Sequence, residues 1–174
     1  MNLFAENDEC NLCEFKESLE LLRQSSFLAT LPLEALKLFA YLCRRELYRA
    51  GEDLVTIGED DGKAFLIIEG TACLMHSETM GETCLRRFEA GEFIGYLSLL
   101  GEMPRLYTLR AHVDTRCLVL TRDRFFKAMK QFPDLWPRVF TGILNRILAW
   151  DRGVLEMAGA LPEAMRRTLG VSLL

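Results

Sequence analysis

Histidine is scarce in this chain of 174 residues, which contains only His76 and His112, far apart in the sequence. Catalytic metal centres are commonly built from clustered histidines and carboxylates, and two isolated histidines cannot assemble such a centre. No Ser-His-Asp, Cys-His or paired-carboxylate arrangement stands out either. We therefore expect no enzymatic activity and no bound metal.

Long apolar runs and an excess of positive charge are also missing. No apolar segment is long enough to cross a bilayer, and the N-terminus lacks a basic region followed by an apolar one. The formal net charge is −4, which gives no sign of a nucleic-acid partner. With half of its residues hydrophobic and 26% charged, the chain has the composition of an ordinary globular domain with a sizeable core. We expect a cytoplasmic protein with no membrane contact.

The six cysteines do not form the dense framework of a small secreted domain. Cys10 and Cys13 make a CxxC pair, which can seed a zinc or iron–sulfur site. A closed site needs four ligands, and no second CxxC or histidine pair supplies them. We expect no metal at this pair, and buried small hydrophobic residues at the others, which are Cys43, Cys73, Cys84 and Cys117.

Helical periodicity marks the N-terminal part of the chain. Residues 1–13 are polar and irregular and are predicted to form a loose arm. Apolar residues then recur at helical spacing from Glu14 to Gln24. A second apolar-faced helix is predicted from Leu33 to Leu42, with Thr30 as its cap and Pro32 in its first turn.

After Gly51 the pattern changes to short strands separated by glycine-containing turns. One of these turns, residues 58–62, is acidic and flanked by glycines. The run that follows it is continuously apolar and predicts a buried strand. Several short strands at even spacing predict a sandwich, barrel or jelly roll. The expected strands cover residues 54–57, 64–70, 71–76, 83–88, 108–113 and 117–121.

The chain is organised around residues 91–108, which read as a strand end, a glycine turn, one helical turn, a proline-marked loop and another strand. Gly95 lets backbone amides approach a ligand, and exposed donors at a helical turn attract anions. Arg105 could complete such a site, because a guanidinium matches a phosphate. The alternative is a surface turn in which Arg105 forms a salt bridge.

This stretch resembles the phosphate-binding cassette of the cyclic-nucleotide-binding domain family, which includes bacterial Crp/Fnr-type regulators and kinase regulatory subunits. The matching positions are Gly95, Leu97, Leu99, Leu100, Pro104, Arg105 and Thr108. The resemblance covers about residues 26–158 and implies an α+β fold, a double-stranded β-helix (jelly roll) with N-terminal helices and a long C-terminal dimerisation helix. It also implies a ligand, cyclic AMP or another small anion, at Gly95, Tyr96, Leu97, Arg105, Leu106 and Thr108.

Three positions depart from the family's pattern. Tyr96 stands where the family has the glutamate that holds the ribose hydroxyl. Leu106 and Tyr107 stand where the family has small residues. A bulky residue in a tight site costs about 1–3 kcal/mol, and loss of a charge-assisted contact costs a similar amount. These changes predict weak or absent binding of ordinary cyclic nucleotides.

The last long helix is predicted from the apolar heptad seam at residues 136–157. A second apolar stripe, at Leu144, Leu148 and Leu155, predicts two partners, one of them the same helix of a second chain. The alternative is one wide stripe packed within the monomer. The resemblance implies a homodimer through this helix. The expected interface residues are Trp136, Phe140, Ile143, Ile147, Trp150 and Val154.

The predicted organisation is an arm and helix at residues 1–25, the β-roll at 26–132, the dimerisation helix at 133–158 and a short tail at 159–174. Crp/Fnr-type regulators need a helix-turn-helix after the dimer helix, and the tail is too short for one. We expect no direct DNA binding.

Two functional hypotheses follow. The first is a non-catalytic sensor module that binds a small anion and signals through its dimer helix to an unidentified downstream protein. The alternative is a degenerate domain that serves as a dimeric protein-interaction scaffold. A haem-sensing variant, with His76 or His112 as axial ligand, would be revealed by a Soret band.

Overall fold

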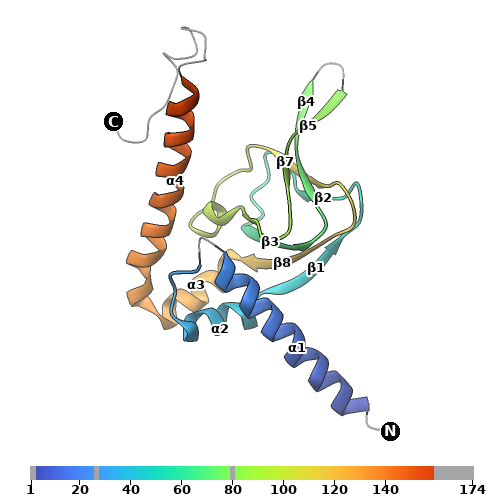
Figure 1. The fold of residues 1–174 in the computed structure, drawn as a ribbon, viewed down its shortest axis with the longest axis vertical. Coiled ribbons are helices and arrows are strands. Elements are labelled where there is room, and N and C mark those ends of the chain that lie inside the picture. The colour runs from blue at the N-terminus through green and yellow to red at the C-terminus, as the bar shows by residue number, and fades with distance from the viewer. Residues whose placement is uncertain (1–2, 26–27, 79–80, 159–174) are drawn as a thin grey trace. The chain divides into compact units, whose positions relative to one another are not determined.

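The computed structural model describes the backbone of residues 3–25, 28–78 and 81–158 (Figure 1). The chain divides into two compact units, Met1–Pro133 and Asp134–Leu174, and each is described by itself. The predicted tail at residues 159–174 lies outside the described residues.

Two four-stranded antiparallel sheets form the body of the first unit. One sheet has the order β1 (Arg44–Tyr48), β8 (Thr115–Thr121), β3 (Lys63–Glu69) and β6 (Phe93–Ile94). The other has the order β2 (Asp53–Val55), β7 (Thr108–Ala111), β4 (Ala72–Glu78) and β5 (Gly81–Phe88). Apart from the hairpin of β4 and β5, consecutive strands lie in different sheets, as in a double-stranded β-helix. The predicted jelly-roll fold is therefore confirmed.

The core of the roll is apolar and contains residues from strands of both sheets. Along β3, Phe65 and Ile67 belong to this core, while Ala64 and Leu66 are equally buried. A strand buried on both faces reads as a continuous apolar run, which is the pattern seen in the sequence. The core cluster consists of Leu54, Val55, Phe65, Ile67, Ala72, Ile94, Leu109, Ala111, Cys117 and Val119.

Three helices belong to this unit: α1 (Leu3–Gln24), α2 (Leu33–Leu42) and α3 (Arg122–Gln131). α3 follows directly from β8 and contacts it, and α1 contacts β3. The rings of Phe39 on α2 and Phe125 on α3 stack with centroids 5.8 Å apart. Figure 1 shows α2 and α3 side by side below β8.

The structure corrects two details of the N-terminal prediction. The loose arm predicted for residues 1–13 is wrong, because α1 already begins at Leu3. The cap of α2 is Pro32 rather than Thr30. Proline suits this place because the first turn of a helix has N–H groups without intrahelical acceptors.

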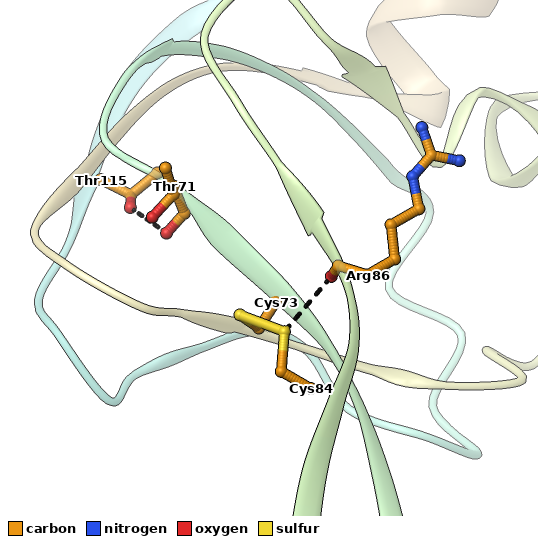
Figure 2. Close-up of a disulfide and its surroundings, with 5 residues drawn as sticks. All are labelled: Thr71, Cys73, Cys84, Arg86 and Thr115. Atoms are coloured by element: carbon orange, nitrogen blue, oxygen red, sulfur yellow. Dashed lines mark hydrogen bonds between the residues drawn. A yellow bond between two sulfur atoms is a disulfide. The ribbon is translucent and has the colours of Figure 1, made fainter.

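The cysteine pattern also differs from the expectation. Cys73 on β4 and Cys84 on β5 form a disulfide across the hairpin, and the Cys84 Sγ lies 3.5 Å from the carbonyl of Arg86 (Figure 2). Burial raises the pKa of Cys43 and that of Cys117 to about 12, which keeps both thiols protonated at neutral pH. Cys13 is exposed.

The second unit begins with a 3-10 turn, η2 (Pro133–Leu135), whose first residue closes the first unit, and continues as α4 (Trp136–Ala158). Pro137 lies in the first turn of α4, where its missing N–H is tolerated. Among the described helices, none combines the length and the apolar character needed to cross a lipid bilayer.

Candidate functional site

A pocket of about 240 Å³ opens beside the segment that joins β6 to β7. β6 ends at Ile94, Gly95 turns the chain with φ of +79°, and the 3-10 turn η1 (Tyr96–Leu99) follows. The loop then returns through Pro104 and Arg105 to β7. We call this site the cassette pocket; its lining residues are Gly95, Tyr96, Leu97, Ser98, Met103, Pro104, Arg105, Leu106 and Tyr107.

Five of the six ligand residues predicted from the sequence line this pocket, and Thr108 does not. Thr108 begins β7, and its hydroxyl accepts a hydrogen bond of 3.2 Å from the backbone N–H of Ile57. This contact ties the start of β7 to the loop after β2. Thr108 therefore supports the frame of the pocket from outside its lining.

Among the described residues that line the cassette pocket, Arg105 is the only charged one, and only 6% of its surface is exposed. Its guanidinium donates to the Asp61 carboxylate through Nε at 3.1 Å and through Nη2 at 2.6 Å. Nη2 also donates to the backbone carbonyl of Lys63. The Lys63 N–H in turn donates to Asp61 Oδ1 at 3.0 Å. Arg105 is thus held in an ion pair, as in the alternative stated from the sequence, but the pair is buried and does not lie at a surface turn.

Gly95 makes this arrangement of Arg105 possible. A Cβ built on Gly95 would lie 2.7 Å from Arg105 Nη1 and 3.0 Å from the Lys63 carbonyl oxygen. A side chain at this position would therefore force the Arg105 guanidinium to shift and would crowd the Lys63 carbonyl, and the positive φ also favours glycine. The space beside Gly95, which was predicted to hold a ligand, is filled by the guanidinium itself.

A second arginine lies beside the pocket and is also paired. Arg122, the first residue of α3, donates through Nε to the backbone carbonyl of Ser98 at 2.8 Å. Its Nη1 donates to Asp60 at 3.1 Å, and its Nη2 donates to the same carboxylate. The bond to Arg122 holds the pKa of Asp60 below its usual value. The turn after β2 therefore supplies one carboxylate to each arginine.

The remaining lining side chains are mainly apolar or aromatic. Tyr107 packs against the core of the roll, and its burial raises the pKa of its hydroxyl. Tyr96 is half-buried at the start of η1. Leu106 is 80% exposed, so its side chain lies at the mouth of the pocket instead of filling it. The bulk expected at this position does not close the site.

Asp60 and Asp61 are not among the site residues predicted from the sequence, in which they belong to an acidic turn. Two consecutive carboxylates beside a glycine are a signal for such a turn. The cassette loop contributes Met103 to the pocket as well, which no motif marks. The acidic turn was the sequence signal for the two aspartates.

The other predicted groups are placed as follows. Among the described side chains, no group of three or more His, Cys, Asp and Glu residues could hold a metal ion. His76 and His112 are exposed. In the predicted seam of α4, Phe140 and Trp150 are exposed, Ile143 is buried, and Trp136, Ile147 and Val154 are half-buried.

Comparison with known proteins gives one family match and several solved structures of similar fold. The family model described as "Cyclic nucleotide-binding domain" matches residues 45–132, just over half of the chain. Among solved structures, a catabolite activator protein from Thermus thermophilus is 26% identical with a TM-score of 0.63. That match covers 84% of this chain and 73% of that chain.

Curated relatives match over short stretches. A cAMP-dependent protein kinase regulatory subunit from Candida albicans is 33% identical over 66 residues, which are 38% of this chain and 14% of that protein. Patatin-like phospholipase domain-containing protein 7 from Rattus norvegicus is 24% identical over 107 residues, 60% of this chain. The chain spans only 8% of the length of that phospholipase-domain protein.

Proposed function

Because this chain belongs to the cyclic nucleotide-binding domain family, we propose that it is a non-catalytic regulatory module that binds a small ligand in the cassette pocket. The observation that carries the proposal is the pocket itself, a cavity of about 240 Å³ between η1 and the loop that leads into β7. Small-ligand sites are concave and largely apolar, with few polar groups. The cassette pocket has that character, with one guanidinium among apolar and aromatic walls.

The ligand expected from the sequence is cyclic AMP or another small anion. It would have to be held by Arg105, whose Nε and Nη2 already serve Asp61 and the carbonyl of Lys63. A phosphate that binds this guanidinium would have to use Nη1, which makes neither of those contacts, or compete for Nε and Nη2. Displacing Asp61 from Nε and Nη2 exposes its desolvated carboxylate to a second negative charge, which is unfavourable.

The second candidate function is a degenerate domain that binds no cyclic nucleotide and acts as a dimeric protein-interaction scaffold. The buried Arg105–Asp61 pair favours this candidate, since the residue meant for a phosphate is occupied. The replacement of the expected ribose-binding glutamate by Tyr96 favours it too. The two candidates differ in one respect, which is whether any small molecule enters the pocket.

A thermal-shift screen that includes cyclic AMP and cyclic GMP tests the sensor function. Met103→Trp adds bulk to the pocket lining, whereas Ile57→Trp adds the same bulk at an exposed position outside it. We expect at least one compound to raise the melting temperature of wild type and of Ile57→Trp, but not of Met103→Trp. If no compound acts through the pocket in this way, the scaffold candidate stands alone.

Signalling through α4 is the second part of the proposal. The helix presents exposed apolar side chains, among them Phe140, Leu144, Trp150 and Leu155. Exposed apolar side chains in such number are typical of an interaction surface. We propose that they pair with α4 of a second copy, so that a ligand shifts the dimer helix and through it a downstream protein.

Charges introduced into the predicted seam are expected to break this homodimer. Phe140→Glu combined with Trp150→Glu places four like charges in a two-fold interface, and wild type should sediment as a dimer while the double variant sediments as a monomer. Sedimentation velocity at several concentrations measures the change. Glu substitution at Tyr41, which is exposed on α2, is the matched control and should leave the dimer intact. A wild-type protomer that never associates would contradict the prediction.

A further inference from the structure

The disulfide of the β4–β5 hairpin has one sheltered and one accessible end. Cys73 on β4 is only 3% exposed, whereas Cys84 on β5 is an exposed residue (Figure 2). An external thiol therefore meets the bond from the side of Cys84. Exposed disulfides are the labile and regulatory ones, while structural disulfides resist reduction by small thiols.

The bond lies where the pairing of the hairpin is interrupted. Cys73 is opposite Arg87 and Cys84 is opposite Met75, and the register shifts between Leu74 and Met75. Such a shift disrupts the ladder of hydrogen bonds locally. Among the described strands, β5 is at the edge of its sheet and pairs with β4 alone. The disulfide therefore secures β5 at the weakest place of its pairing.

Little else holds β5 in place. Residues 81–87 are all exposed, and only Phe88, at the end of the strand, packs against the core of the roll. The ion pairs of Glu82 and Arg86 have exposed members, and such pairs contribute little to stability. A strand with few buried apolar contacts opens at low cost in free energy. The attachment of β5 therefore depends on the disulfide.

The strand that the disulfide secures leads into the cassette. After β5 the chain passes through Glu92, which accepts a hydrogen bond from Arg86 at 2.8 Å, to β6 and the turn at Gly95. β4 pairs on its other side with β7, which begins where the cassette loop ends. The disulfide thus ties the strand before the cassette to the sheet that contains the strand after it.

We propose that Cys84 is a redox-modification site, at which small thiols and small disulfides exchange with the Cys73–Cys84 bond and so release or secure β5. The inference does not depend on whether the cassette pocket binds a ligand. A small thiolate attacks Cys84 Sγ, its new S–S bond forms as the bond to Cys73 breaks, and Cys73 leaves as a thiolate that takes up a proton. A second small thiol then reduces the mixed disulfide. In total, two small thiols become one small disulfide and the protein gains two thiols.

Reduced and oxidised glutathione in defined ratios test the exchange. A background with Cys10→Ser and Cys13→Ser removes the two cysteines of α1, and burial raises the pKa of Cys43 and that of Cys117 to about 12, which keeps both thiols protonated. We expect the protein to pass from mostly disulfide to mostly dithiol within these mixtures, as measured by alkylation and mass spectrometry. A bond that stays intact in reduced glutathione alone is a structural staple, and the proposal is then wrong.

Two single variants identify the sulfur that reacts. Cys73→Ala leaves the exposed Cys84 thiol, and Cys84→Ala leaves the sheltered Cys73 thiol. With oxidised glutathione, Cys73→Ala should form its mixed disulfide at least tenfold faster than Cys84→Ala. Equal rates, or a faster reaction of Cys84→Ala, would overturn the assignment of Cys84. If either variant folds poorly, the glutathione titration of the native pair still decides whether the bond exchanges.

Hydrogen–deuterium exchange of the full chain measures the release of β5. On reduction, the amides of residues 81–88 should exchange at least tenfold faster. Those of β3 and β8, which are paired on both sides, should change less than twofold. The double variant Cys73→Ala with Cys84→Ala is the control and should exchange like the reduced protein in either condition. Unchanged exchange in β5 would show that the disulfide does not secure the strand.

Discussion

Asp61→Ala should lower the free energy of unfolding by about 3 kcal/mol, because it leaves the Arg105 guanidinium buried without its counter-ion. The Arg105 side chain is only 5% exposed, and Asp61 is the carboxylate that accepts its Nε and Nη2 donors. The carbonyl of Lys63 remains as an acceptor, but it carries no charge. Chemical denaturation monitored by circular dichroism measures the loss.

The neighbouring carboxylate provides the comparison. Asp60→Ala breaks the ion pair with Arg122. The Arg122 side chain is 20% exposed and the Asp60 side chain 29%, so water can solvate the arginine that is left. Its expected cost is below about 1 kcal/mol. Equal losses in the two variants would contradict the buried character of the Arg105–Asp61 pair.

The pair should also behave as a unit. Asp61→Leu combined with Arg105→Met removes both charges and leaves apolar groups of similar size. Replacing a buried ion pair in this way is often neutral or stabilising, so the double variant should be more stable than Asp61→Ala alone. Strict additivity of the two single substitutions would show that the residues do not interact.

Much of the roll was predictable because its local signals agree with one another. Glycines mark the corners, and the apolar run at residues 64–70 predicted β3, which spans Lys63–Glu69. β1 was missed because its residues are largely polar and none of its side chains is fully buried. Strand β1 is made by its pairing with β8, a contact between distant parts of the chain. Sequence periodicity does not carry information of that kind.

The disulfide and the ion pairs escaped prediction for the same reason. Cys73 pairs with Arg87 and Cys84 with Met75, on either side of a register shift between Leu74 and Met75, so the two cysteines are not directly opposite each other in the hairpin. A spacing of eleven residues does not reveal that shift. The pairing of Arg105 with Asp61 crosses 44 residues of sequence. The cassette pattern singled out Gly95 and Arg105, which do lie together at the pocket. The pairing of Arg105 depends on a partner that only the fold brings close.

Two carboxylates in one turn therefore hold the two arginines beside the cassette. In the pattern read from the sequence, Gly95 and Arg105 share a ligand between them. In the structure, Gly95 instead gives Arg105 room to reach inward to Asp61 and Lys63. In this structure the glycine and the arginine are kept together by packing.

Gly95→Val should accordingly be among the most damaging single substitutions in the chain, lowering the free energy of unfolding by about 4 kcal/mol. The positive φ of +79° costs a branched side chain about 1–2 kcal/mol. Overpacking against Arg105 Nη1 and the Lys63 carbonyl adds about 1–3 kcal/mol. Denaturant titration of the purified variant measures the sum, and Gly95→Ala should show a smaller loss of the same origin.

Two other glycines separate strain from crowding. Gly91 has φ of +86°, and a Cβ at this position would have nothing within 4 Å, so Gly91→Val should lose only the backbone share, about 1–2 kcal/mol. At Gly101 a Cβ also meets open space, and Gly101→Val should stay within about 0.5 kcal/mol of wild type. Shortening Arg105 to Ser should remove part of the penalty at Gly95 and none at Gly91, because the crowding at Gly95 comes from that guanidinium. If Gly95→Val lowers the free energy of unfolding no more than Gly91→Val does, the Arg105 guanidinium does not fill the space beside Gly95, and the account of Arg105 as packed against this glycine is wrong.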